Sequence, residues 1–588
     1  MKFEELTEYF DKLEKVSSRL TMIDILTELL KKISPDEIAK TIYISQGVLA
    51  PPFMNLKLGI ADKIIEDAIA NSINIPKQQI EQIYRKTGDL GLAAKQILEE
   101  RSKLQTINKN EYSILDIYKI MIKISSTSGK GSKDIKIKLF SNLISSSTPR
   151  EVKYIIRYAL GQLRLGFGDY TILEALSVVS TGNRQFKLEL EHAYNICSDL
   201  GYVGEILYKK GINAIKNMQV TLFKPIRPAL AEREVTFHQI IERMKGKCAV
   251  EQKYDGFRCQ IHKKNNIVKI FSRNLDETTH MFPDIVKEVI NSINENEIIF
   301  EGEAIAFNEV TQEFLPFQET IQRKRVYNII DKIKEVPLHL FAFDLMYLNG
   351  VTYLNVEYEK RREILEKILK NSKLISPSKR IITGSENELE TFFEESIENG
   401  LEGIVAKNLK SNYTAGARKF TWIKMKRSYK GELSDSLDLV IIGYFLGKGS
   451  RAEFKFGGLL CAVYNKKNDM FETISKIGTG FNEKEMIKFQ SLLDRIKLKN
   501  KPVRVDSVIV PDFWVEPKYV ITVRADEITK SPTHTCGKKD NIGYALRFPR
   551  LVSSEEKIIR NDKNAEDATT TEEIIEMFKQ QKLSKISE

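Results

Sequence analysis

The hexapeptide K-Y-D-G-F-R at positions 253–258 constrains this chain most, because it places a lysine between two short apolar segments. Residues 248–250 predict one strand, and the alternation of apolar and polar residues from 257 to 262 predicts the next. At this tight junction Gly256 lets the backbone pass close to a ligand, and Arg258 can bind phosphate oxygens. Lys253 is therefore a candidate nucleophile, provided that burial or nearby cations keep part of it unprotonated. The same residues are also typical of an ordinary hairpin turn.

A series of further motifs follows the lysine in order, each at or inside a predicted strand. They are Ser272-Arg273-Asn274, Phe300-Glu301-Gly302-Glu303-Ala304, Phe341-Ala342-Phe343-Asp344, Glu402-Gly403-Ile404-Val405-Ala406-Lys407 and Trp422-Ile423-Lys424-Met425-Lys426. The series resembles motifs I, Ia, III, IIIa, IV and V of the covalent nucleotidyltransferases, the superfamily of DNA ligases, RNA ligases and mRNA capping enzymes. It is the order of the motifs, more than any one of them, that carries the resemblance.

The flanking chain is similar to the ATP-dependent DNA ligases of the archaeal and eukaryotic replicative type. The segments that carry this similarity are Phe223 to Ala231, Glu251-Gln252, Phe317-Gln318, Arg323-Lys324-Arg325, Arg524 to Ile528 and Leu546 to Arg550. The resemblance runs through nearly the whole chain. It implies an enzyme that seals nicks in duplex DNA through a lysyl-AMP intermediate, in DNA replication, repair and recombination.

Length and composition agree with this expectation. A chain of 588 residues predicts about three to four domains. The excess of 91 Lys and Arg over 80 Asp and Glu favours a polyanionic partner, although a solvated basic surface would give the same balance. The five scattered cysteines predict neither a disulfide framework nor a zinc site. With no signal peptide and no apolar run of about 20 residues, we expect a cytoplasmic, nucleoid-associated protein without a membrane contact.

The patterning predicts a multidomain fold. Helical spacing dominates up to about residue 215, and the resemblance makes this an all-α DNA-binding domain, residues 1–218. Strands dominate after a proline-punctuated segment, giving an α+β adenylation (nucleotidyltransferase) domain at 219–427. A charged hinge at 427–432 then leads to an OB-fold β-barrel at 428–588, closed by a terminal helix that the capping box Thr570-x-x-Glu573 opens.

Two features of the helical part suggest contact with DNA. The loop at 126–133 is rich in Gly, Ser and Lys but lacks the spacing of a P-loop, so it either binds DNA phosphates or serves as a flexible linker. Arg157, Arg164 and the sequence Leu163-Arg164-Leu165-Gly166 match the helical DNA-binding domain of such ligases. The task of this domain would be to hold the duplex.

The resemblance also implies roles for individual residues. Lys253 would attack the α-phosphorus of ATP. The expected nucleotide-binding residues are Glu251, Arg258, Arg273, Glu303, Phe343, Arg418 and Lys424. Glu303 and Glu402 would hold Mg²⁺, with Mn²⁺ as an alternative ion, because carboxylates and phosphate oxygens suit hard cations.

Several of these residues have an ordinary structural interpretation when taken alone. The sequence around Phe343 is typical of a core aromatic residue. Arg273 and Glu303 are typical of residues in surface salt bridges. Lys424 and Lys426 alternate with apolar residues and would share one face of a strand, which is also what a solvent-facing edge looks like.

The last expected motif departs from the family pattern. Arg560, Asp562 and Lys563 match its R-x-D-K element, but residues 551–559 form an insertion before it. By resemblance, Arg560 and Lys563 would close over ATP in the first step.

The expected partners are nicked duplex DNA, ATP and, by resemblance, a sliding clamp, and we expect a monomer. An RNA ligase, a capping guanylyltransferase and a non-catalytic DNA-binding scaffold are the alternatives, and the long helical region has no obvious role in the first two. NAD dependence is disfavoured by the lack of a cysteine zinc finger.

Overall fold

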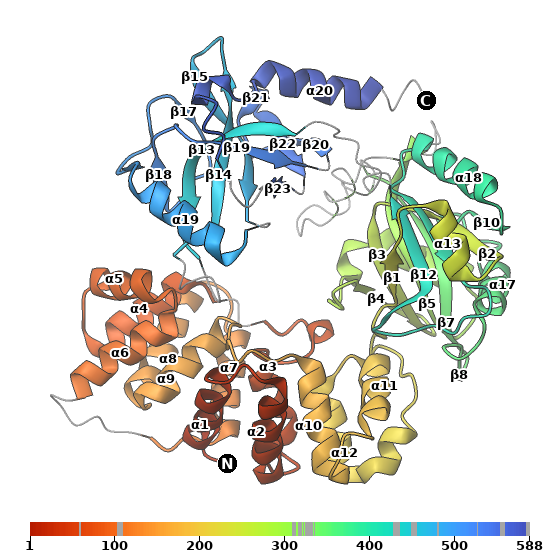
Figure 1. The fold of residues 1–588 in the computed structure, drawn as a ribbon. Coiled ribbons are helices and arrows are strands. Elements are labelled where there is room, and N and C mark those ends of the chain that lie inside the picture. Colours follow the sequence, from red (N-terminus) through yellow and green to blue (C-terminus); the bar gives the residue numbers. More distant parts are fainter. Residues whose placement is uncertain are drawn as a thin grey trace. The chain divides into compact units, whose positions relative to one another are not determined.

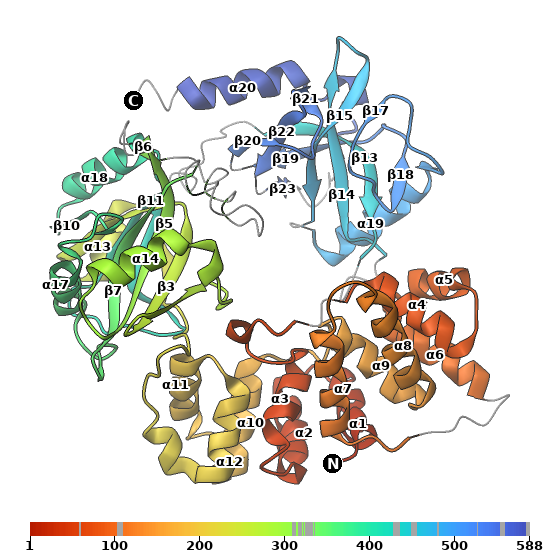
Figure 2. The same ribbon diagram turned by 180° about the vertical axis from the view of Figure 1, so that it is seen from behind.

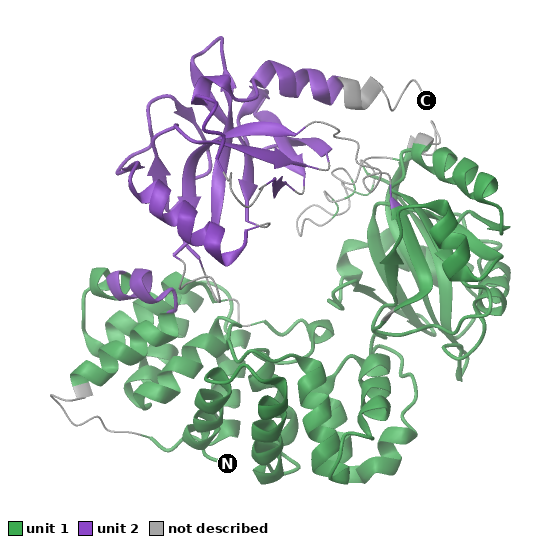
Figure 3. Cartoon of the chain, in the orientation of Figure 1, with its two compact units in different colours: residues 1–81, 90–425 green, residues 82–89, 426–588 purple. Residues whose placement is uncertain are grey.

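The computed structural model describes residues 1–57, 60–102, 110–308, 313–314, 320, 323, 333, 336–426, 436–447, 455–478, 481–525, 527–547, 549–552 and 559–583. The expected hinge at 427–432 lies outside these residues, as do Phe317-Gln318 and Lys324-Arg325. The chain divides into two compact units (Figure 3). Unit 1 comprises residues 1–81 and 90–425, and unit 2 comprises residues 82–89 and 426–588.

The N-terminal part of the chain is helical, as predicted, and is drawn red to yellow in Figure 1. Its helices are α1 (Phe3–Glu14), α2 (Arg19–Lys32), α3 (Ile38–Gln46), η1 (Pro52–Met54), α4 (Asp62–Ile73), α5 (Lys77–Thr87), α6 (Leu90–Ser102), α7 (Ile114–Ser126), α8 (Ser132–Ser145), α9 (Pro149–Ala159), α10 (Asp169–Thr181), α11 (Lys187–Cys197) and α12 (Leu200–Lys216). Capping boxes at Ser113 and Thr148 satisfy the free amides that begin α7 and α9.

The central region, residues 230–426, contains two sheets among its described residues. In the first, the strands lie in the order β1 (Leu230–Arg233), β12 (Arg418–Lys426), β11 (Gly403–Lys407), β2 (Cys248–Lys253) and β10 (Arg380–Thr383). In the second, the order is β4 (Ile267–Ser272), β3 (Phe257–Lys264), β5 (Glu297–Asn308), β7 (Leu338–Leu348) and β8 (Val351–Thr352), while β6 (Glu313–Phe314) pairs with β5 and β9 (Ile375–Pro377) with β7. Every predicted motif therefore lies at or in a strand.

Helices cover the outer faces of these sheets. Helices α13 (Phe237–Met244) and α18 (Glu386–Glu398) pack on the first sheet, and α14 (Pro283–Ser292), preceded by η2 (Thr279–Met281), and α17 (Tyr358–Leu369) pack on the second (Figures 1 and 2). A further core joins the inner faces, where Trp422 of β12 packs with Ile299 and Met346 of the second sheet. The candidate site lies along this junction between the sheets.

Unit 2 is rich in strands and has the expected OB-like architecture. One sheet has the order β16 (Lys497–Leu498), β18 (Phe513–Val515), β13 (Leu437–Phe445), β14 (Gly458–Asn465), β15 (Met470–Ile477) and β17 (Val505–Asp506), with β19 (Val520–Arg524) on β13 and β23 (Arg550–Leu551) on β19. Another has the order β20 (Glu527–Ser531), β22 (Ile542–Arg547) and β21 (Cys536–Lys539). The helical elements are α19 (Glu483–Asp494), η6 (Ala565–Asp567) and α20 (Thr571–Leu583).

The predicted capping box of the terminal helix is confirmed. The Glu573 carboxylate accepts from the Thr570 amide at 2.7 Å, and the Thr570 hydroxyl accepts from the Glu573 amide at 3.3 Å. Among the described residues, every helix is too short or too polar to cross a membrane.

Candidate active site

Lys253 is the last residue of β2 and lies where the chain crosses from one sheet to the other. Strand β2 pairs with β10 and β11, whereas β3 pairs with β4 and β5. The hairpin interpretation of this segment is therefore wrong, because β2 and β3 belong to different sheets. A Cβ at Gly256 would lie 2.2 Å from the carbonyl oxygen of Ala304 in β5, so only glycine fits this crossing.

Glu402 is the nearest charged partner of Lys253. The Lys253 Nζ lies 2.5 Å from Glu402 Oε2, and the Glu402 amide donates to the Lys253 carbonyl at 3.0 Å. Glu402 directly precedes β11, whose first residue, Gly403, stands opposite Lys253 in the sheet. The pairing of the two strands thus brings the end of one motif to the start of another.

Glu303 completes this group from the second sheet. It stands opposite Arg258 in the pairing of β5 with β3. Burial raises the pKa of Glu303 to about 7, with the nearby Glu402 and Asp255 charges acting in the same direction and the Lys253 and Arg258 charges opposing them. The charges of Lys253, Glu303 and Glu402 therefore lie close enough to influence one another.

Arg258 has well-defined protein partners in the structure. Its Nε and Nη2 donate to the Glu301 carboxylate at 3.2 and 2.8 Å, and its Nη1 donates to the Ala229 carbonyl at 2.9 Å. The Tyr413 hydroxyl donates to the same carboxylate at 2.7 Å. Arg258 therefore links the segment before β1 to the second sheet.

Glu251, two residues before the lysine on β2, lies in a buried polar cluster. Only 3% of its side chain is exposed. Its carboxylate accepts hydrogen bonds from the Tyr358 hydroxyl, from Arg362 at 3.2 Å and from Lys407 at 2.9 Å. We call these four residues the Glu251 cluster.

The other expected nucleotide residues have different surroundings. Phe343 is half-buried, packs edge-to-face on Trp422 at 6.0 Å and so only partly fits the interpretation as a core aromatic. Lys424 is half-buried on β12 between the fully buried Ile423 and Met425, so its side chain lies on the face opposite theirs. The Arg418 side chain lies outside the described residues.

Arg273 is exposed and lines a pocket away from the other motif residues described above. With Arg227 it borders a pocket of about 450 Å³ that also includes Tyr43 and Asp169 of the helical region. Asp169 accepts from the Tyr194 hydroxyl at 2.6 Å and lies 3.6 Å from Arg227. The structure thus places Arg273 in a pocket shared with the helical region.

The sequence pattern missed several residues of this site. Tyr358, Arg361 and Arg362 lie on α17, whose sequence reads as a solvated helix, yet all three are almost fully buried. Arg361 makes a double hydrogen bond to Asp344 at 2.7 and 3.0 Å. The acidic motif residue Asp344 at a buried strand position was the available signal that a cation would be needed.

The two features of the helical region that were expected to bind DNA differ in exposure. Arg157 is 3% exposed and donates to Glu14 at 2.9 Å, so it is a structural residue there. The loop at 126–133 joins α7 to α8, and Lys130 at its tip is exposed between Gly129 and Gly131, both of positive φ. The loop is therefore open to a partner, whereas Arg157 is not.

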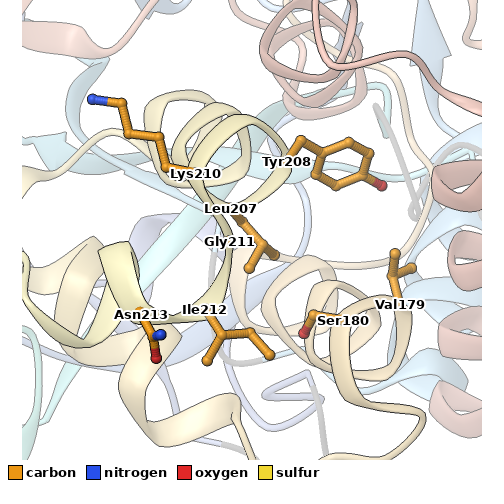
Figure 4. A pocket seen from close by; sticks show the side chains of 8 residues that line it. All are labelled: Val179, Ser180, Leu207, Tyr208, Lys210, Gly211, Ile212 and Asn213. Carbon is orange, nitrogen blue, oxygen red and sulfur yellow. The ribbon is translucent and has the colours of Figure 1, made fainter.

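A pocket of about 630 Å³ lies in the helical region beside a break in α12 (Figure 4). The break occurs at Gly211, whose φ is 75°. Val179 and Ser180 of α10 line the pocket opposite residues of α12. None of the lining residues belongs to the motif series, so this pocket stands apart from the candidate site.

The last motif can be described within unit 2 alone. Lys563 Nζ lies 2.7 Å from Asp438, and Arg560 lies 3.2 Å from the same carboxylate and 2.7 Å from Asp562. Residues 553–558 of the insertion before it lie outside the described residues. Both cations expected to act on ATP are thus paired with Asp438 in the structure.

Family models match most of the chain. The model described as "DNA ligase N terminus" matches residues 2–177, "ATP dependent DNA ligase domain" matches residues 228–426, and "ATP dependent DNA ligase C terminal region" matches residues 452–563. The central match contains all of the motifs from Lys253 to Lys426.

Curated relatives are similar over their full length. A "Probable DNA ligase" of Dictyoglomus turgidum is 46% identical, covering 100% of this chain and 99% of its own. A "DNA ligase" of Hyperthermus butylicus is 41% identical, covering 99% and 98%. Among solved structures, "Pmar-Lig_PreS3" is similar in fold, with a TM-score of 0.57 and 16% identity over 93% of this chain and 98% of that one.

Proposed function

The chain belongs to the ATP-dependent DNA ligase family, and on that premise we propose that Lys253 is the nucleophile through which it seals nicks in duplex DNA. The observation that carries this proposal is the placement of Lys253 at the crossing between the two sheets, where its amine meets Glu402 at 2.5 Å and remains 24% exposed. A lysine that is only partly covered can reach a phosphate, and the Glu402 carboxylate beside it can take the proton that the amine must lose to form a covalent bond.

The chemistry consists of three transfers. The Lys253 amine attacks the α-phosphorus of ATP, loses a proton and expels pyrophosphate, so that a P–N bond replaces a P–O bond. The 5′-phosphate of the nick attacks the same phosphorus, the P–N bond breaks, and the nitrogen regains a proton. The 3′-hydroxyl then attacks the 5′-phosphate, forms the phosphodiester and releases AMP as its proton leaves. Glu402 is placed to accept the proton that Lys253 loses first.

A divalent cation, Mg²⁺ or Mn²⁺, fits the carboxylates of this site. Glu303 is half-buried and close enough to Glu402 for the two charges to interact, and two carboxylates plus phosphate oxygens and waters suit Mg²⁺. Within the described residues no cluster of three or more acidic, His or Cys side chains could form a complete protein cage. We assign Glu303 and Glu402 as the metal residues. When bound, the ion would offset the charge on the transferring phosphate.

The remaining nucleotide residues are assigned by their positions around the lysine. Glu251 would meet adenine and Phe343 would stack on it, because Glu251 lies two residues before Lys253 on β2 and Lys407 contacts both Glu251 and Phe343. Lys424 and Arg418 on β12 would contact the phosphates of the nucleotide. Arg273, which follows β4 and lines the pocket shared with the helical region, would contact the nucleotide or the 5′-phosphate of the nick. Arg258 would contribute through its bond to Glu301, in addition to any direct contact with the nucleotide.

The domain limits and partners follow from the same family membership. We propose that residues 1–218 hold DNA, residues 219–427 carry out adenylation, and residues 428–588 form the OB-fold domain. Arg560 and Lys563 would exchange Asp438 for ATP during the first step. We further propose that the protein acts as a monomer beside the nucleoid, in replication, repair and recombination, with a sliding clamp as a further partner.

The decisive experiment measures the mass of the intact protein after exposure to ATP, GTP or NAD. The expected result is the added mass of one adenylate with ATP, located by peptide mapping to the fragment that contains Lys253, followed by sealing of a nicked DNA duplex. The added mass of one guanylate with GTP, and no adduct with ATP, would indicate a guanylyltransferase. Sealing of nicked RNA but not of nicked DNA would indicate an RNA ligase, and the absence of any adduct would leave only a binding protein.

A further inference from the structure

The Glu251 cluster contains a buried lysine that the proposed chemistry does not use. Lys407 is the last residue of β11, and only 1% of its side chain is exposed. Its ammonium lies 2.9 Å from Glu251 Oε2 and donates to the carbonyl of Phe343 at 3.0 Å. A single cation therefore joins the two residues that we assign to adenine.

The surroundings of Lys407 are aromatic on several sides. Its Nζ lies 4.3 Å from the ring centre of Trp422, 4.8 Å from that of Phe343 and 5.0 Å from that of Tyr358. Ring faces attract cations at these distances. The lysine thus contacts Phe343 both over its ring and through its backbone carbonyl.

Stability alone is a weak reason to bury such an ion pair. Removing an ammonium and a carboxylate from water costs about as much as their attraction returns, and well-packed apolar residues of similar size often replace buried pairs without loss. Burial indeed lowers the pKa of Lys407, although the charges of Glu251 and Asp344 oppose this effect. We therefore look for a role of the Glu251–Lys407 pair in selecting the nucleotide base.

The donors around Glu251 show what that function is. A carboxylate offers about four lone-pair directions, and three of them face the hydroxyl of Tyr358, the guanidinium of Arg362 and the ammonium of Lys407. Three donors keep the group an acceptor and fix its orientation. The remaining direction suits an N–H donor, such as the exocyclic amine of adenine, and disfavours the carbonyl oxygen that guanine carries at the same position.

We propose that Lys407 is a positioning residue for base selectivity, which holds the Glu251 carboxylate and the Phe343 ring in the arrangement that accepts a 6-amino purine. This inference rests on the proposed function, because it assumes that Lys253 reacts with ATP. Lys407 itself would touch neither the base nor the reacting phosphate. It acts by fixing the two residues that do touch the base.

The test compares Lys407→Met with the wild type, using ATP and purine riboside triphosphate, which lacks the 6-amino group. Enzyme adenylation is followed by intact mass at a series of nucleotide concentrations. In the wild type, loss of the amino group should lower kcat/KM by at least about tenfold. In Lys407→Met, kcat/KM for ATP should fall by a similar factor, mainly through KM, and the two nucleotides should become nearly equal. Lys407→Arg should restore part of the preference.

Two controls separate this role from a purely structural one. Lys410→Met, at an exposed position after the same strand, should behave like the wild type. If Lys407→Met does not fold, Tyr358→Phe removes one donor from the same carboxylate and should reduce the preference by a smaller factor. An unchanged preference in the folded variants would overturn the inference and leave the proposed function intact. Absence of an ATP adduct on the wild type would instead refute the proposed function.

Discussion

The helical region and the central region both bury charged side chains, but the charges have different neighbours. In the helical region, Lys153 lies between Asp11 at 2.9 Å and Glu14, and Arg157 shares Glu14 at 2.9 Å. These residues tie α9 to α1. In the central region, the buried charges of Glu251 and Lys407 adjoin Phe343 and the strand that ends at Lys253.

This difference teaches that burial of a charge does not by itself mark a functional site. The cluster in the helical region is closed, since its cations and anions come from the same pair of helices. The Glu251 cluster has a carboxylate with room for one more donor and lies beside a half-buried ring. Four experiments test this difference between the two regions.

The largest effect is expected at the nucleophile. Lys253→Ala should reduce the rate of adenylate formation by more than about 10⁴-fold, because no other amine occupies its place. Binding to nicked DNA should change little, since the exposed cations of the helical region remain. Intact mass and a nick-binding titration measure the two properties on one sample. Full adduct formation by this variant would contradict the assignment of the nucleophile.

The next largest effect concerns the closed cluster. Glu14→Ala should lower the free energy of unfolding by about 3 kcal/mol, because the buried Arg157 loses its carboxylate partner. Urea unfolding followed by circular dichroism measures this change. Glu8→Ala on the same helix is the matched control, since its pair with Arg150 is exposed and should be worth less than about 1 kcal/mol. Adenylation per folded molecule should stay normal in both variants.

A third prediction concerns acid stability of the central region. Burial lowers the pKa of His262 from 6.5 to about 3, so the unfolded chain binds a proton at this residue before the folded chain does. The free energy of unfolding should therefore fall as the pH drops from 6.5 towards 3, by up to about 1.4 kcal/mol per pH unit for this residue. Above pH 6.5 the histidine makes no pH-dependent contribution. Unfolding measured at several pH values should show a shallower slope for His262→Gln, and equal slopes would argue against its buried neutral state.

The smallest effect is expected in the loop of the helical region. If Lys130 contacts a DNA phosphate, Lys130→Ala should lower the slope of log affinity against log salt by about one and leave adenylation unchanged. Lys15→Ala, at an exposed position after α1, is the control. A slope equal to that of the control would identify the loop at 126–133 as a linker.

The sequence predicted the strands of the central region well, because each motif coincides with a short apolar alternation. The covered face of β12 followed from the alternation of Ile423 and Met425 with lysines, and the structure confirms that both apolar residues are fully buried. The capping box at Thr570 was also readable, since its two residues lie three positions apart. Such features depend on near neighbours only.

Features that depend on distant partners could not be read in the same way. Pairing places β2 and β3 in different sheets although three residues separate them, and no local pattern records this. Arg361 and Arg362 look solvent-facing until β7 and β2 supply Asp344 and Glu251. Lys407 lies within a motif, but its contact with Glu251 depends on the pairing of β11 with β2 and is known only from the structure.

The short connector from Lys253 to Phe257 has a mechanical consequence. Its three residues are the only covalent link between β2 and β3 at this edge, and Tyr254 anchors it by stacking on Phe341 at 4.2 Å. A sliding motion of one sheet against the other would therefore displace the Lys253 amine directly, because three residues are too short to absorb the movement. A shift of the sheets relative to each other would then change the rate of turnover by moving the Lys253 amine. An added residue in the connector would uncouple the position of the amine from such a shift.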